Sequence, residues 1–238
     1  MNQKALAILA ATAASVIYGI NHTIAENLMP EIIQPYGFIF LRISGAAILF
    51  WLLSLFLPSE KIAKSDRLRF LACGLFGMTI NMLMFFKGLS LSTPINSSVV
   101  ITLVPVILLI LSAIFLKEKI TWNKYIGIGL GLLGALILIF LGIKTQNNAP
   151  NIPLGNILFL VNASSYSIYL IIVKPLVKKY NSITLMKWLF LIAFIINFPI
   201  GINEFIEVEW SQLPLDIISK LIFVVIGTTF FTYLFNIY

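Results

Sequence analysis

Residues 94–142 limit the possible folds more than any other stretch, because they join two long apolar segments through one short charged turn. The first segment ends at Leu116, the turn is Lys117-Glu118-Lys119, and the second segment follows directly. Roughly 20 helical residues cross the ~30 Å hydrocarbon core of a bilayer. The stretch therefore predicts a transmembrane hairpin whose turn lies in water.

Composition excludes an ordinary soluble domain. Hydrophobic residues make up 60% of the chain and charged residues only 11%, whereas soluble domains carry about 25% charged residues. The net charge of +7 is spread between the apolar segments, so it indicates membrane orientation and not nucleic-acid binding. The single cysteine, Cys73, cannot form an intrachain disulfide or a thiolate metal site, and we expect no metal or cofactor.

Hydropathy predicts an all-α integral membrane protein with eight transmembrane helices. Lipid offers no hydrogen-bond partners to free backbone groups, and no alternating strand pattern is visible. The N-terminus leads straight into a full-length span, which favours a first helix over a cleaved signal peptide. The expected spans are residues 5–25, 36–57, 68–90, 95–116, 122–143, 153–173, 184–203 and 217–238.

The distribution of basic residues predicts the orientation of these spans. The positive-inside rule counts Lys and Arg, so we expect the side that carries most of them, with the N-terminus, in the cytoplasm. The protein is then a multi-pass protein of the cell (inner) membrane, and six of its nine acidic residues lie outside. The 12 of 16 basic residues on the cytoplasmic side are Lys4, Lys61, Lys64, Arg67, Arg69, Lys117, Lys119, Lys124, Lys174, Lys178, Lys179 and Lys187.

Two pairs of segments indicate an internal duplication. Gly77–Phe85 aligns with Gly227–Phe235 at an offset of 150 residues, and the stretch around Tyr18 aligns with that around Tyr166 at an offset of 148. Near-equal offsets predict a repeated five-helix unit, and an odd number of spans makes the two copies insert in opposite senses. The expected domains are a first repeat at 1–145, a linker at 146–152 and an incomplete second repeat at 153–238.

The chain resembles the EamA-type branch of the drug/metabolite transporter superfamily. The matching pieces are Tyr18-Gly19, Phe40-Leu41-Arg42, residues 85–100, Leu103–Val106, Leu116–Lys119 and residues 127–139. The resemblance implies ten helices in two inverted repeats and a central cavity lined by helices one, three, four, six, eight and nine. It also implies outward movement of small metabolites, amino acids among them. This chain departs from the family in having Tyr18 where tryptophan is frequent, and in lacking counterparts of helices nine and ten.

Polar residues inside the third and fourth spans are candidates for the cavity lining. Pro105 is expected to kink its helix and free the carbonyl four residues earlier, near the hydroxyls of Ser97 and Thr102. A kink that serves packing alone is the alternative. In span three, Asn81 shares a helical face with Phe85, and its amide must face protein or a wet cavity. A helix–helix hydrogen bond is the alternative there.

Span six carries the most polar run of any span. Asn162, Ser165, Tyr166 and Tyr169 have the spacing i, i+3, i+4 and i+7, which is one face of a helix. The two tyrosines are suited to stack on a ligand and to hydrogen-bond it. The resemblance also places span six at the cavity, together with Tyr18 of span one. A polar seam between two helices is the alternative.

Three cations fall in the outer third of the predicted membrane: His22, Arg42 and Lys87. With Asn21 assisting, they are candidates to attract a substrate carboxylate or phosphate. Alternatively, Lys87 reaches the outer surface, Arg42 binds helix-end carbonyls and His22 pairs with Glu26. No acidic residue falls within a predicted span, which disfavours a carboxylate proton relay and leaves uniport, exchange or coupling through His22.

These patterns favour a secondary transporter in contact with the lipid bilayer and a small-molecule substrate. One alternative is a non-transporting fragment, or a subunit whose partner completes the cavity, because the second repeat is incomplete. Another is an intramembrane enzyme, which would need convergent catalytic groups around His22 or Cys73. Gly127-x-x-x-Gly131 predicts a close-approach helix face, within the fold or in a homodimer through span five.

Overall fold

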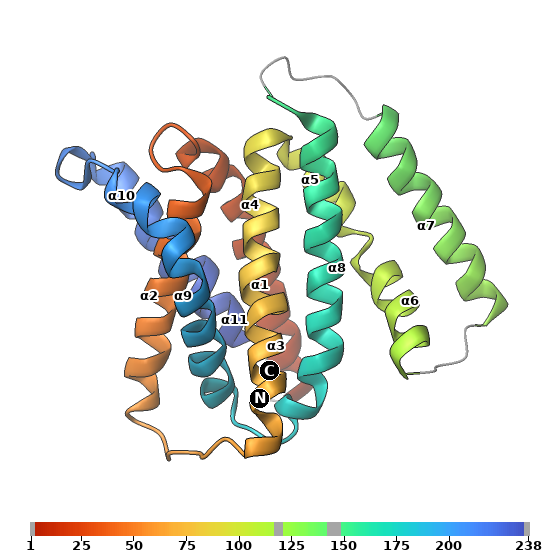
Figure 1. Cartoon of the computed structure of the whole chain (residues 1–238), viewed down its shortest axis with the longest axis horizontal. Coiled ribbons are helices and arrows are strands. Elements are labelled where there is room, and N and C mark those ends of the chain that lie inside the picture. Colours follow the sequence, from red (N-terminus) through yellow and green to blue (C-terminus); the bar gives the residue numbers. More distant parts are fainter. Residues whose placement is uncertain (1–2, 117–120, 142–148, 236–238) are drawn as a thin grey trace. The chain divides into compact units, whose positions relative to one another are not determined.

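The computed structural model describes residues 3–116, 121–141 and 149–235, which form helices joined by short connections (Figure 1). No strand occurs among these residues, as predicted for an all-α protein. The predicted turn at Lys117–Lys119 and residues 146–148 of the predicted linker lie outside the described residues. The elements are α1 (Gln3–Leu28), α2 (Pro35–Ser54), η1 (Lys64–Asp66), α3 (Arg67–Cys73), η2 (Gly74–Ile80), α4 (Asn81–Leu91), α5 (Pro94–Ile101), α6 (Val104–Leu116), α7 (Trp122–Leu141), α8 (Ile152–Val177), α9 (Ser182–Ile206), η3 (Trp210–Gln212), α10 (Leu215–Phe223), η4 (Val224–Phe231) and α11 (Thr232–Phe235).

Six helical segments of the described chain are long and apolar enough to cross a bilayer, as in a multi-pass membrane protein. The first and fifth predicted spans are helical too, as α1 of 26 residues and α7 of 20 residues. The total of eight transmembrane helices stays a prediction. The six segments are Pro35–Ser54, Lys64–Leu91, Pro94–Phe115, Ile152–Val177, Ser182–Ile206 and Leu215–Phe235.

Local sequence decides where the helices of span four begin and break. Thr93 caps α5 because its hydroxyl oxygen accepts the Asn96 N–H at 3.2 Å, and Pro94 occupies the first helical position. The helix predicted over 95–116 is interrupted between α5 and α6, just before Pro105. Proline lacks the N–H that would continue the helical ladder, so the break lies where the sequence predicted a kink.

The chain divides into two compact units. Unit 1 comprises residues 1–75 and 175–238, and unit 2 comprises residues 76–174. The predicted repeats are defined by sequence duplication and not by compactness. Their boundaries therefore stay a prediction.

The core of unit 1 is the antiparallel helix pair α2 and α9 (Figure 1). The start of α2 meets the end of α9 at glycine: a Cβ atom on Gly201 would lie 2.4 Å from the Tyr36 carbonyl oxygen. Near the other end of the pair, the rings of Phe50 and Phe190 stack with their centroids 5.4 Å apart. The two helices thus touch through backbone at one end and through aromatic rings at the other.

A wide π-helical turn interrupts two of the spanning segments, as η2 between α3 and α4 and as η4 between α10 and α11. The segment η2 begins at Gly74 and η4 at Val224, an offset of 150 residues that equals the offset of the aligned sequence segments. In η4, the hydroxyls of Thr228 and Thr229 donate to carbonyls five residues earlier. The threonine hydroxyls therefore donate hydrogen bonds to backbone carbonyls along the widened turn.

In unit 2, α4 and α8 approach closely through glycines. A Cβ atom on Gly155 would lie 2.8 Å from the Gly88 carbonyl oxygen. On α7, a Cβ atom on Gly131 would meet the Val106 side chain at 3.0 Å, whereas one on Gly127 would meet nothing within 4 Å in the described part of the chain. A homodimer through α7 stays a prediction.

Candidate functional site

A guanidinium is buried among hydroxyl groups in unit 1. Arg42 on α2 is only 2% exposed, and its Nε donates to Thr229 Oγ1 of η4 at 2.9 Å. Its guanidinium carbon lies 5.8 Å from the centroid of the Phe38 ring, and Tyr18 and Tyr233 interact with its charge. The group formed by Arg42, Tyr18, Thr229, Thr232 and Tyr233 is called the Arg42 cluster below.

Helix α1 and the segment η4–α11 position the hydroxyl groups of this cluster. The hydroxyl of Tyr18 on α1 is hydrogen bonded to the side chain of Thr232. Thr229 donates its own hydroxyl proton to the Val224 carbonyl at 2.9 Å, which leaves its oxygen to accept from Arg42. The wide turn of η4 permits the bond from Thr229 to the Val224 carbonyl, which lies five residues earlier.

The Arg42 cluster has the chemistry of an anion site. A charge inside a membrane-spanning helix is costly, and such residues line substrate or ion pathways in membrane proteins. A guanidinium presents five N–H donors in a planar fork, which suits the two oxygens of a carboxylate or phosphate. Neighbouring hydroxyls can both donate and accept, so they suit the remaining polar groups of a small substrate.

The polar residues of α8 make hydrogen bonds within unit 2. Asn162 Nδ2 donates to the Asn81 carbonyl at 2.7 Å, and Asn81 Nδ2 faces the Asn162 carbonyl at 3.5 Å. Ser165 Oγ donates to the Phe76 carbonyl at 2.6 Å. These bonds join α8 to the segment η2–α4, which is the polar seam given above as the alternative. A role of the same residues in a cavity stays a prediction.

The two tyrosines of this row lie side by side, with ring centroids 5.8 Å apart. Tyr169 is buried and its ring covers Gly77, where a Cβ atom would lie 2.4 Å from the ring carbon Cδ2. Tyr166 is half-buried. On the neighbouring α4, Phe85 is buried, with its ring centroid 5.8 Å from that of Phe159. The Tyr169 ring is therefore packed against the glycine of the neighbouring segment, and Phe85 is packed against Phe159 further along α8.

The predicted residues of span four use their hydroxyls locally. Ser97 and Thr102 each donate to the carbonyl three residues earlier, at 2.8 Å and 2.6 Å. Ser97 is buried, whereas Thr102 and Pro105 are exposed. Of this group, only Ser97 lies in the packed interior of unit 2.

The predicted cations have different surroundings. Arg42 lies in the buried cluster of unit 1, and Lys87 is a half-buried residue of α4 in unit 2. Asn21 is 2% exposed, and its Oδ1 has no hydrogen-bond partner among the described residues. The side chain of His22 lies outside the described part of the structure. Within unit 1, the structure thus brings Arg42 together with Tyr18.

Sequence reasoning missed the threonines and the tyrosine of the eighth span. Thr228, Thr229 and Thr232 have the spacing i, i+1 and i+4, and Tyr233 follows. That spacing places polar groups on one side of an otherwise apolar helix, which is a usable signal for a polar face.

The expected seventh span ends at residue 203, which leaves Glu204 among the acidic residues expected outside, whereas in the structure Glu204 belongs to α9 and is half-buried. Its Oε2 accepts the backbone N–H groups of Tyr36 and Gly37 at 2.7 Å and 2.8 Å. These N–H groups belong to the first turn of α2, so the carboxylate caps that helix from a residue far away in the chain.

Comparison with known proteins decides the family. A profile of the EamA-like transporter family matches residues 5–140, which is more than half of the chain. The chain belongs to this family. A protein of Archaeoglobus fulgidus named an uncharacterized transporter is 31% identical over 204 residues, which are 85% of this chain and 69% of the relative.

Two relatives of this EamA-like chain come from Bacillus subtilis, and both are named uncharacterized transporters. YyaM is 22% identical over 74% of this chain and 59% of its own length. YetK is 24% identical over 86% of this chain and 62% of its own length. The chain thus spans 59 to 69% of the length of these three curated relatives. A solved crystal structure, 15% identical, aligns with a TM-score of 0.60 over 98% of this chain and 80% of that chain, which shows a shared fold.

Proposed function

We propose that this EamA-like transporter is a secondary transporter that moves small polar metabolites, amino acids among them, out of the cell. Transport proceeds by alternating access between two inverted five-helix repeats, without an enzymatic step. The protein lies in the cell (inner) membrane with its N-terminus in the cytoplasm. The proposed cavity residues are Tyr18, Asn21, His22, Asn81, Phe85, Ser97, Thr102, Pro105, Asn162, Ser165, Tyr166 and Tyr169, with Arg42 and Lys87 attracting the anionic group.

Three features support the inverted repeats. The equivalent helices α2 and α9 run antiparallel, as a two-fold axis in the membrane plane requires. The π-helical turns recur at an offset of 150 residues, and so do Asp66 and Asp216 at the start of their spanning segments. Finally, α2 packs against η4 of the eighth span and α9 packs against α3 of the third span, so the second span of each proposed copy contacts the third span of the other.

The contact between Arg42 and Thr229 carries the proposal that the substrate is polar and bears an anionic group. It joins the second span of one proposed repeat to the third span of the other, and repeat interfaces are where secondary transporters bind substrate. The carboxylate of an amino acid matches the guanidinium fork. Tyr18 contributes a hydroxyl and a ring that suit the rest of a small zwitterion.

The test is substrate counterflow in liposomes that contain the purified protein, with a panel of radiolabelled amino acids. Arg42→Met is expected to lower the transport rate at least about tenfold, because a hydrogen bond to a charged group contributes about 1.5–3 kcal/mol. Arg42→Lys keeps the charge but loses the planar fork, and is expected to retain part of the activity. Arg67→Met, which removes an exposed arginine at the start of α3, is the matched control.

Competition by substrate analogues separates the parts of the proposal. Methyl esters of a transported amino acid are expected to compete poorly, because they lack the carboxylate. Equal competition by acid and ester would remove the anionic group from the proposal. Absence of counterflow for every compound, with folded protein in the liposomes, would contradict transport of small metabolites by this chain.

A further inference from the structure

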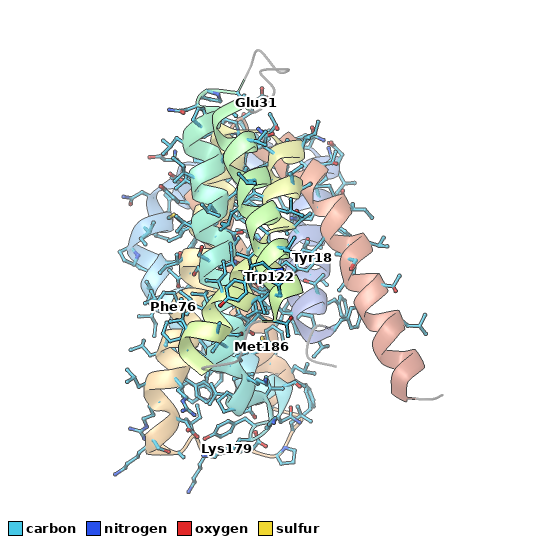
Figure 2. All side chains as sticks on the ribbon, turned by 90° about the vertical axis from the view of Figure 1, so that its right-hand side faces the viewer. Tyr18, Glu31, Phe76, Trp122, Lys179 and Met186 are labelled. Atoms are coloured by element: carbon cyan, nitrogen blue, oxygen red, sulfur yellow. The ribbon has the colours of Figure 1, made fainter. Side chains whose placement is uncertain are left out.

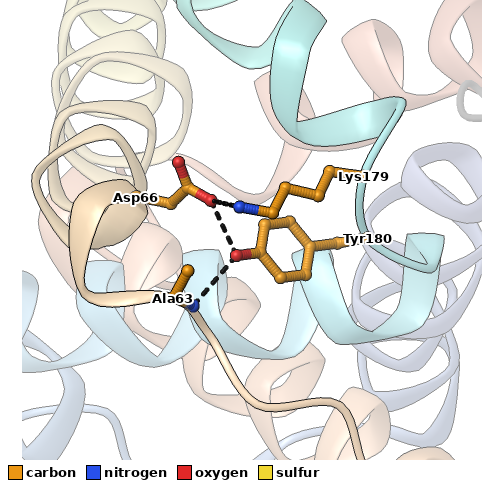
Figure 3. A network of polar contacts seen from close by, with 4 residues as sticks. All are labelled: Ala63, Asp66, Lys179 and Tyr180. Carbon is orange, nitrogen blue, oxygen red and sulfur yellow. Dashed lines mark hydrogen bonds and ion pairs between the residues drawn. The ribbon is translucent and has the colours of Figure 1, made fainter.

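Two connections far apart in the sequence meet at the end of unit 1 where α2 ends and α9 begins. Asp66 Oδ2 accepts hydrogen bonds from Lys179 Nζ at 2.5 Å and from the Tyr180 hydroxyl at 2.7 Å (Figure 3). The Tyr180 oxygen in turn accepts the Ala63 N–H at 3.0 Å. Asp66 of the first connection is therefore bonded to two side chains of the second, and Tyr180 is also bonded to the backbone of the first. We call Asp66, Lys179 and Tyr180 the loop latch.

The loop latch is partly shielded from water. Asp66 and Tyr180 are each 7% exposed, and the Phe70 ring packs edge-on against Tyr180 at 5.3 Å between centroids. Lys179 lies on the outer side of the loop latch. Its hydrogen bond to Asp66 raises the pKa of the lysine, so the lysine is protonated at physiological pH. If the two connections separated, the shielded carboxylate would lose both donors, so the bonds favour the joined state.

The latch chemistry is not repeated by the equivalent aspartate. Asp216 lies 150 residues after Asp66 and pairs with Lys220 of its own helix at 3.3 Å. Near that end of unit 1, Glu204 joins α9 to α2, but it does so between helices that already touch through glycine. Among the described residues, the bond of Asp66 thus joins connections of two different proposed repeats at the Lys179 end. The bond of Asp216, in contrast, stays within one helix.

We infer that the loop latch is a gate: it holds the Lys179 end of unit 1 closed and shifts the protein toward the state that is open at the opposite end. The inference rests on the proposed alternating access, because the two joined connections belong to different repeats. Under the predicted orientation the latched end faces the cytoplasm, so the unloaded transporter rests in its outward-open state. Release of the latch is then a step of the transport cycle.

The chain contains its own reporter of this gate. Cys73 is the single cysteine, is fully buried, and lies on α3 two turns beyond Asp66. The next residue, Gly74, packs against Leu189 and Ile192 of α9. Separation of the two connections would part the starts of α3 and α9 and expose the thiol. The rate at which a hydrophilic maleimide labels Cys73 therefore measures opening at this end.

The experiment compares Asp66→Asn and Lys179→Met with the matched control Lys178→Met, in the purified full-length protein without substrate. Lys178 is the exposed neighbour of Lys179. We expect the two latch variants to label at least about threefold faster than wild type, and the control to label at the wild-type rate. Exchanging the charges, with Asp66→Lys and Lys179→Asp together, is expected to restore slow labelling.

Equal labelling of Asp66→Asn, Lys179→Met and wild type would overturn the gate, and so would fast labelling of the charge-exchanged protein. Thermal unfolding and total thiol content in denaturant identify variants that do not fold. For that case Tyr180→Phe, which keeps the ring and the ion pair but removes the hydroxyl, is expected to label faster than wild type as well. Because labelling needs no substrate, it reports on the gate even if the counterflow assay contradicts transport.

Discussion

Some polar side chains of the spanning helices bind partners on other helices. Arg42 donates to Thr229, and Asn162 donates to the Asn81 carbonyl. Each bond gives a polar group the hydrogen-bond partner that lipid cannot offer. The sequence marks Arg42 and Asn162 as exceptions within apolar runs, so both could be predicted as important. It does not identify their acceptors, because a threonine or a carbonyl in an apolar run carries no distinctive signal.

Glu204 gives a prediction at this scale. Its carboxylate accepts two N–H groups of the first turn of α2, where a negative charge is favourable. We expect Glu204→Gln to lower the free energy of unfolding by about 1–2 kcal/mol, because a neutral amide accepts more weakly and adds donors. The measurement is thermal unfolding in detergent. Glu207→Gln, at an exposed carboxylate three residues later, is the control, and equal shifts in both variants would show that the cap contributes nothing.

At the scale of elements, the sequence predicted the helix interruption that a proline marks and missed the two π-helical interruptions that no residue type marks. Pro105 marks the interruption between α5 and α6 because proline lacks an N–H. The π-helical turns η2 and η4 need no particular residue, and only their common offset of 150 residues connects them to the duplication. The observed helix ends also differ from the predicted ones, since α9 extends past residue 203 and includes Glu204.

The contact between α2 and α9 gives a prediction at the element scale. Gly201→Ala is expected to lower the free energy of unfolding by about 1–3 kcal/mol, because the new methyl group would meet the backbone oxygen of Tyr36. Gly127→Ala places the same methyl group in open space on α7 and is expected to be neutral or slightly stabilising. Thermal unfolding of the two variants tests this, and equal destabilisation would contradict the close contact.

At the scale of the molecule, the orientation in the membrane stays a prediction from the distribution of basic residues. Figure 2 shows Lys179 and Glu31 at opposite ends of this unit, with Tyr18 between them. The two connections that the loop latch joins contain Lys61, Lys64, Lys178 and Lys179, so the positive-inside rule assigns this end to the cytoplasm.

Orientation is tested with single cysteines introduced in a Cys73→Ser background. Lys61 and Gln212 are both exposed, in the connections that follow α2 and α9. An impermeant maleimide added to intact cells is expected to label Gln212→Cys and to spare Lys61→Cys until the membrane is opened. Labelling of Lys61→Cys in intact cells would reverse the topology and move the loop latch to the outer side.

The sequence by itself determined the membrane-spanning helices, the break at Pro105, the uneven distribution of basic residues and the resemblance to the EamA-like family, which the family profile confirms. Each depends on local composition or on order along the chain, which the sequence states directly. Only the tertiary structure decided that Arg42 meets Thr229, 187 residues away, and that Asp66 meets Lys179, 113 residues away. A hydrogen bond requires two atoms within about 3 Å, and that proximity arises from the packing of whole helices, which no local pattern contains.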